Sequence, residues 1–78
     1  MTAQAERAFR NLQAVVEAAG GRMGNAVKVT RFLTDLSHFD AVNQVYARFF
    51  THKPARATVG VAALPKGALV EVEAVARL

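Results

Sequence analysis

Two stretches of the chain carry apolar residues at three- and four-residue spacing, which is the pattern of an amphipathic helix. The first covers residues 2–19 and ends at Gly20-Gly21, where glycine lets the backbone leave the helix. Its apolar stripe consists of Ala5, Ala8, Phe9, Leu12, Val15, Val16 and Ala19. The second covers residues 37–50, with Ser37 and Asp40 resembling a capping box at its start. Its stripe consists of Phe39, Val42, Val45, Tyr46, Phe49 and Phe50. We interpret both stripes as core.

Residues 26–34, AVKVTRFLT, have the composition of a β-strand. Alternation places Val27, Val29 and Leu33 on one face, with Arg31 in the same row. An arginine in an apolar row is unusual. We expect Arg31 either to snorkel at a sheet edge or to lie on a face that is poorly covered.

The stretch from Pro54 to Ala76 alternates on both sides of a short loop at residues 64–67, which predicts a β-hairpin. We expect Ala63 to pair with Ala68, which merges two apolar rows into one buried face. These rows are Ala55, Ala57, Val59, Val61 and Ala63 in the first strand and Ala68, Val70, Val72, Ala74 and Ala76 in the second. The opposite face then presents Arg56, Thr58, Gly60, Glu71 and Glu73. The pattern alone leaves open whether this polar face is solvated or forms a site.

Length and composition limit the class of protein. Seventy-eight residues allow a single domain, 1–78, whose core is marginal by itself. Apolar residues make up 53% of the chain and there is no cysteine, which favours a cytoplasmic globular protein without disulfides. No apolar run is long enough to span a bilayer, and the first ten residues lack the apolar core of a signal peptide.

The charged residues exclude several kinds of site. The net charge is +4, but the ten basic residues are scattered without interleaved aromatic residues, so nucleic acid is an unfavoured partner. His38 and His52 are the only histidines, and we expect both at the surface. A zinc site needs three or four convergent ligands, so we expect no metal. There is no Ser/His/Asp or Cys/His arrangement and no phosphate-binding glycine loop.

Several blocks of the chain resemble the RidA (YjgF-type, endoribonuclease L-PSP) reactive-intermediate deaminase family. In order they are NLQAVVEAAGG, VKVTRFLTDLSHFDAVNQVYARFF, HKPAR and PARATVGVAALPKGALVEVEAVA. The resemblance implies an α+β, chorismate-mutase-like fold, with a mixed sheet backed by two helices. Here the element order is α-β-α-β-β, and we expect the family's N-terminal strands to be missing. It also implies a homotrimer.

The resemblance further implies hydrolysis of 2-imino or enamine acids, such as 2-iminopropanoate, to 2-keto acids and ammonia, without a cofactor. Carried over residue by residue, Arg56 clamps the substrate carboxylate and Glu71 positions or activates the water. The backbone around Thr58 contacts the imine nitrogen. Asn43 is either an outer member of the site or a half-buried amide that bonds to backbone.

The predicted hairpin register places Arg56 and Glu71 four rungs apart, roughly 13 Å. We therefore expect the site to lie at a cleft between subunits. Two alternatives remain open from the residues: a non-catalytic module that binds or senses a small carboxylate, and, less favoured, an endoribonuclease or translation inhibitor.

Overall fold

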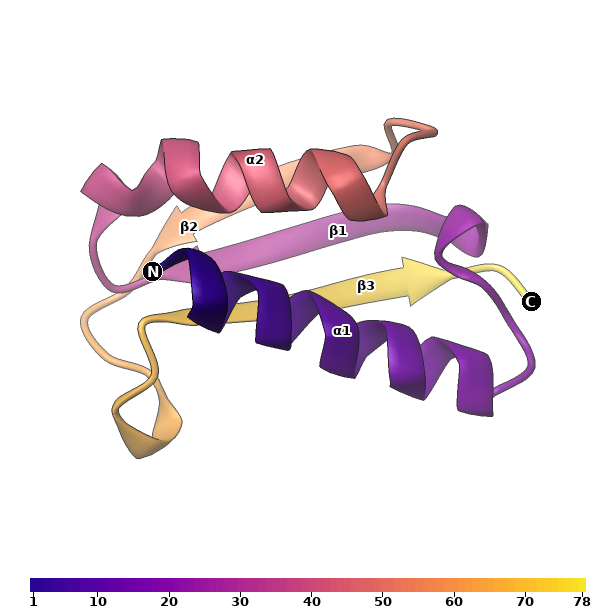
Figure 1. Ribbon diagram of the computed structural model, residues 1–78, viewed down its shortest axis with the longest axis horizontal. Coiled ribbons are helices and arrows are strands. Elements are labelled where there is room, and N and C mark those ends of the chain that lie inside the picture. Colours follow the sequence, from indigo (N-terminus) through magenta and orange to yellow (C-terminus); the bar gives the residue numbers. More distant parts are fainter.

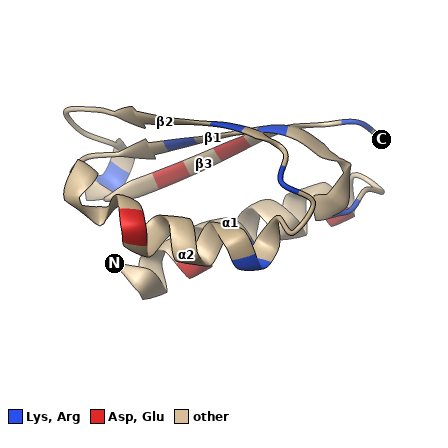
Figure 2. Cartoon of the chain, turned by 90° about the horizontal axis from the view of Figure 1, so that it is seen from above, with Lys and Arg blue, Asp and Glu red and all other residues tan.

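Two helices lie on one face of a three-stranded sheet in the computed structural model of the chain, which describes residues 1–78 (Figures 1 and 2). The elements in chain order are α1 (Thr2–Ala18), β1 (Ala26–Leu33), α2 (Phe39–Phe49), β2 (Ala55–Gly60) and β3 (Val70–Ala76). The predicted α+β class and the order α-β-α-β-β are confirmed. Neither helix combines the length and the apolar composition that a bilayer-spanning segment requires.

The strand order is β2-β1-β3, so the predicted hairpin is wrong. Strand β1 is parallel to β2 and antiparallel to β3, and it separates the two strands that the alternation pattern joined. The chain leaves β2 where Val61 N–H donates to the Leu33 carbonyl, and it returns where Thr34 N–H donates to the Leu69 carbonyl. The connection therefore passes the end of β1 (Figure 1). Period-two alternation reports which residues share a face, but it carries no information about which strand is the neighbour.

The face assignment of β2 is also opposite to the prediction. Val29 and Leu33 of β1 are fully buried beneath the helices, and the parallel register pairs Val29 with Arg56. Paired residues point to the same face, so Arg56 and Thr58 lie on the helix-covered side. Ala55, Ala57 and Val59 lie on the open side of the sheet, which neither helix covers (Figure 2).

A register shift between Ala26 and Lys28 changes the start of β1. Ala26 and Val29 are both buried, whereas Val27, predicted to share the face of Val29, is 50% exposed. An irregularity of this kind inserts an extra residue and reverses the facing of the residues before it. The two expectations for Arg31 are likewise wrong, because Arg31 lies in the central strand and is 1% exposed.

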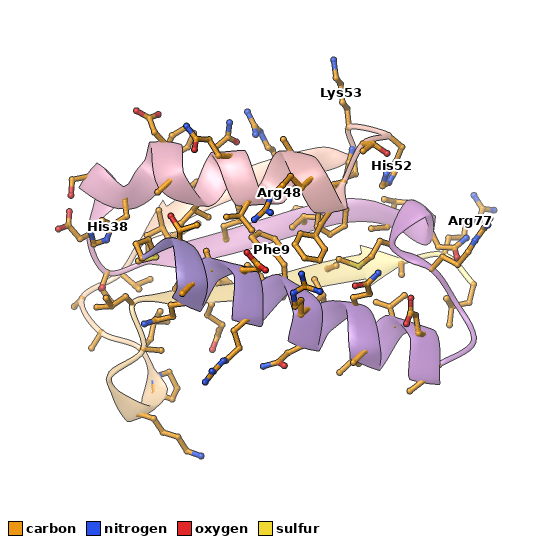
Figure 3. All side chains as sticks on the ribbon, in the orientation of Figure 1. Phe9, His38, Arg48, His52, Lys53 and Arg77 are labelled. Carbon is orange, nitrogen blue, oxygen red and sulfur yellow. The ribbon has the colours of Figure 1, made fainter.

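Phe9 is the centre of the core between the two helices (Figure 3). Its ring stacks on Phe49 at 5.7 Å and meets Tyr46 and Phe50 edge-on, at 6.2 Å and 6.0 Å between ring centroids. Edge-on and offset aromatic pairs stabilise a core beyond the area that they bury. The prediction that the aromatic stripe of the second helix is core is confirmed for this cluster. It is wrong for Phe39, which is 36% exposed, and the prediction for the first stripe is wrong at Val15, which is 67% exposed.

The start of α2 differs from the predicted capping box. The Asp35 carboxylate accepts a hydrogen bond from Ser37 N–H at 2.9 Å, and a short 3-10 turn at Leu36–His38 precedes the helix. The Ser37 hydroxyl and then this backbone hydrogen bond lower the pKa of Asp35. Asp35, rather than Ser37, therefore satisfies a free backbone donor ahead of α2.

Glu6 links the two helices and predicts an acid dependence of stability. Its carboxylate accepts from Arg48 of α2 and from Arg10 one turn along α1, both at 3.0 Å, and these bonds lower the pKa of Glu6 below 4.5. A carboxyl whose folded pKa is depressed stabilises the fold above its unfolded pKa and loses that contribution as pH falls through the folded value.

We expect Glu6→Gln to flatten the loss of stability below pH 4.5, measured as the free energy of unfolding in urea across the acid range. Glu17→Gln, on the same helix and exposed, is the matched control and keeps the acid loss. An acid slope that is the same for Glu6→Gln and the parent chain contradicts this role of Glu6.

Candidate anion-binding site

Polar side chains of β1, β2 and α2 meet beneath α2, on the helix-covered face of the sheet. We call them the arginine cluster, and its members are Arg31, Asn43, Tyr46, Arg56 and Thr58. The pairing of Val29 with Arg56 and of Arg31 with Thr58 brings these strand positions together. Asn43 and Tyr46, three residues apart, lie on one face of α2 and reach down to them. Three of the four sequence-predicted site residues are therefore brought together.

Arg31 is the member of the cluster that the sequence analysis missed as a site residue. Its Nε and Nη2 atoms donate to Thr58 Oγ1 at 3.1 Å and 2.5 Å, and its Nη1 atom donates to Asn43 Oδ1 at 3.0 Å. Its guanidinium carbon lies 5.0 Å from the ring centre of Tyr46 and 5.1 Å from that of Phe39. The signal in the sequence was the arginine in an apolar row.

No carboxylate pairs with Arg31. The two ion pairs of the chain both involve Glu6 of α1, with Arg10 and Arg48 as partners. Burial, followed by the neighbouring Arg56 charge, lowers the pKa of Arg31 from its ordinary value, although an arginine stays cationic at neutral pH. Two aromatic faces and three hydrogen bonds offset part of the cost of burying this charge.

Arg56 is the exposed cation of the cluster. Its Nη1 atom donates to Asn43 Oδ1, the same oxygen that accepts from Arg31, and its guanidinium carbon lies 5.3 Å from the Tyr46 ring centre. The ring and the amide hold the guanidinium at a fixed orientation while leaving its other N–H groups free. Asn43 thus bonds to two arginine side chains, and not to backbone.

A cavity of about 550 Å³ opens beside Arg56, between the second half of α2 and the start of β2. Tyr46, Phe50 and Pro54 supply its apolar wall, and Lys53 adds a further cation. Lys53 and His52 lie in the turn between α2 and β2 (Figure 3). A small concave site with an apolar wall and a few oriented donors is suited to a small anion.

Glu71 lies outside this cluster. It pairs with Phe32, and Phe32 points to the face of β1 opposite Arg31, so the Glu71 side chain is on the open face of the sheet. The prediction that Arg56 and Glu71 lie four rungs apart on one face of a hairpin is therefore wrong, because the two side chains lie on opposite faces of the sheet. Within one chain, Arg56 and Glu71 face different sides.

The histidines form no site with other groups. His52 is exposed and its Nε2 atom lies 2.9 Å from the Ala26 carbonyl oxygen, whereas His38 is half-buried at the other end of α2 (Figure 3). No three His, Cys, Asp or Glu side chains converge in an arrangement that could hold a metal ion.

The whole chain, residues 1–78, matches the family model described as Endoribonuclease L-PSP. Protein DfrA of Myxococcus xanthus is 53% identical over 77 residues, which are 97% of this chain and 59% of that protein. A 2-iminobutanoate/2-iminopropanoate deaminase of Salmonella typhimurium is 46% identical over 80 residues, covering 97% of this chain and 62% of the enzyme.

Two crystal structures superpose closely on the fold. RidA from the Antarctic bacterium Psychrobacter sp. has a TM-score of 0.95 and 47% identity, over 100% of this chain and 64% of its own. TdcF of E. coli, crystallised with bound serine, has a TM-score of 0.91 and 42% identity, over 96% of this chain and 62% of its own. The chain therefore spans between 59% and 64% of the length of these relatives.

Proposed function

Because this chain belongs to the endoribonuclease L-PSP family, the family of the RidA and YjgF proteins, we propose that it hydrolyses 2-imino acids to 2-keto acids and ammonia. Substrates such as 2-iminopropanoate and 2-iminobutanoate follow from the names of its deaminase relatives. The reaction proceeds in the cytoplasm without a cofactor.

The observation that carries this proposal is the oriented, exposed guanidinium of Arg56 beside a small cavity. A guanidinium that lines a cavity and has N–H groups without protein partners can bond both oxygens of a carboxylate at once. Asn43 holds Arg56 from α2, and the β2 backbone at Thr58 contacts the imine nitrogen. The substrate is thereby held with its C=N carbon beside the strand.

The water-activating group comes from a second copy of the chain. Glu71 lies on the open sheet face, away from the Arg56 cavity of its own chain. That open face also carries Val27, Val59 and Val75, which are 50%, 40% and 61% exposed. Apolar side chains from all three strands favour burial against another sheet. In the proposed homotrimer these faces pack together, and Glu71 of one copy reaches Arg56 on the edge strand β2 of the next.

The chemical steps need only these groups. Glu71 accepts a proton from water as the water oxygen bonds to the imine carbon, and the C=N electron pair moves to nitrogen. Glu71 returns this proton to nitrogen, which gives a carbinolamine. Glu71 then accepts the hydroxyl proton and delivers it to the amine as the C–N bond breaks and the C=O bond forms, and ammonia leaves. One water is consumed for each imine.

The position of Glu71 also favours a second candidate, a non-catalytic module that binds a small carboxylate. If the copies do not bring Glu71 to the cavity, Arg56 still captures the carboxylate but no water is activated. A ribonuclease has no support of this kind, because His38 and His52 lie at opposite ends of α2 and no metal site is present (Figure 3).

We expect imine hydrolysis and solution mass to change together. The purified chain is diluted through the range in which light scattering shows its assembly dissociating. Release of 2-oxopropanoate from enzymatically generated 2-iminopropanoate is measured on the same samples. Activity that follows the trimer fraction supports a shared site. A folded trimer without hydrolysis contradicts the deaminase and leaves the carboxylate-binding module.

A further inference from the structure

Two guanidinium groups share a single neutral acceptor in the arginine cluster. Arg31 and Arg56 both donate to Asn43 Oδ1, and neither forms an ion pair. A valine or threonine would satisfy this position of β1 without the cost of burying an unpaired charge. The buried charge of Arg31 therefore points to a role in ligand binding at the neighbouring cavity.

The hydrogen bonds of Arg31 occupy the side-chain acceptors of the arginine cluster. Thr58 Oγ1 accepts twice from Arg31, which uses both of its lone pairs and leaves its O–H to donate elsewhere. Asn43 Oδ1 accepts from both arginines, so its NH₂ group is the end that remains free. The cavity wall beside the cluster carries the cations Arg56 and Lys53 and no carboxylate. The site thus favours a ligand with more than one negative charge.

The proposed reaction leads to the same requirement. An imine that becomes protonated on nitrogen carries a positive charge into a site that already holds Arg31 and Arg56. A monocarboxylate in that form has no net charge, and a second carboxylate restores one negative charge. Because Arg31 is 1% exposed, solvent ions screen its charge poorly.

We propose that Arg31 makes this site selective for 2-imino and 2-keto acids that carry a second carboxylate. The inference rests on the proposed function, since it takes the Arg56 cavity to be the place where the imino acid binds. Arg31 acts through its charge and through Asn43 and Thr58, without touching the ligand. It is a specificity-determining, positioning residue, and its effect is a preference between ligands.

The experiment compares two stable keto acids of equal chain length, 2-oxoglutarate and 2-oxopentanoate, which differ by one carboxylate. Calorimetry measures the dissociation constants of both for the full chain. We expect 2-oxoglutarate to bind about tenfold more tightly. Arg31→Met removes this preference. Arg7→Met, exposed on α1 and equal in its change of net charge, retains it.

A second variant guards against misfolding. Arg31→Gln removes the charge and keeps an amide that can donate to Asn43, and it replaces Arg31→Met if circular dichroism shows that variant unfolded. Because Arg31 has no carboxylate partner, either replacement removes the cost of burying an unpaired charge. A purely structural role of Arg31 predicts that both ligands weaken equally, which overturns the proposal.

The possible outcomes distinguish a failure of this inference from a failure of the proposed deaminase function. If the full chain binds neither keto acid, the proposed function fails and the inference fails with it. If both bind with equal affinity, or if Arg31→Met keeps the preference, the inference alone fails. Inorganic phosphate that competes as strongly as 2-oxoglutarate also overturns it, because the site then selects charge irrespective of the dicarboxylate.

Discussion

Arg56→Met is expected to lower kcat/KM for 2-imino acids by about a thousandfold. The variant loses the two parallel hydrogen bonds to the substrate carboxylate, and hydrogen bonds to a charged group contribute about 1.5–3 kcal/mol each. It also leaves the substrate carboxylate in a cavity where Lys53 is the one remaining cation on the wall. Hydrolysis of 2-iminopropanoate and calorimetric binding of 2-oxobutanoate both measure the loss.

Two variants sharpen this test. Arg56→Lys keeps the charge but cannot bond both oxygens in the same plane, so we expect it to recover only a small part of the activity. Arg48→Met removes an arginine of α2 that bonds to Glu6, and we expect its activity to stay within a few fold of the parent chain. A kcat/KM of Arg56→Met close to that of Arg48→Met would show that the carboxylate binds elsewhere.

Glu71→Gln is expected to lower kcat by about a hundredfold or more while leaving the affinity for 2-oxobutanoate unchanged. The amide cannot accept the proton of the attacking water, and general base catalysis contributes rate factors of about 10² to 10⁴. The substitution keeps the size of the side chain, and Glu71 is exposed, so the fold is retained. Glu73→Gln, two residues along β3 and on the same sheet face, is the matched control.

The opposite facing of Arg56 and Glu71 allows a stricter version of this test. Arg56→Met and Glu71→Gln chains, each inactive alone, are unfolded together and refolded as mixed assemblies. A site formed from Arg56 of one copy and Glu71 of the next is intact in about a quarter of the positions of a random equimolar trimer. Recovery of about that fraction of the activity supports a shared site. No recovery, with mixed trimers present, means that the two residues do not act in one site across copies.

Periodicity was sufficient to place every helix and strand of this chain within a few residues. The stripe of Phe9 and the aromatic residues of α2 also identified the core, because the interior between two helices accepts little except apolar side chains. Arg56, Thr58 and Asn43 came from the resemblance and lie together, since the motif that carries them spans β2 and its helical neighbour.

Strand order and sheet facing depended on the tertiary structure. The alternation of residues 55–76 is compatible with a hairpin and equally with two strands that flank β1. In the structure the two strands flank β1, so both edges of this apolar strand are paired. That choice moved Arg56 and Thr58 beneath α2 and left Glu71 on the open face.

The local pattern of the chain thus determined its elements and most of its core, and the family resemblance identified Arg56, Thr58 and Asn43 as candidate site residues. Only the packing of α2 over β1 and β2 decided that Arg31 joins them. The sequence specifies that Arg31 is charged, but the burial and the partners of its side chain depend on which distant segments cover it. In the sequence, Arg31 stands out only as an arginine in an apolar row. In the folded chain, Asn43, Tyr46 and Thr58 contact it and make it part of the site.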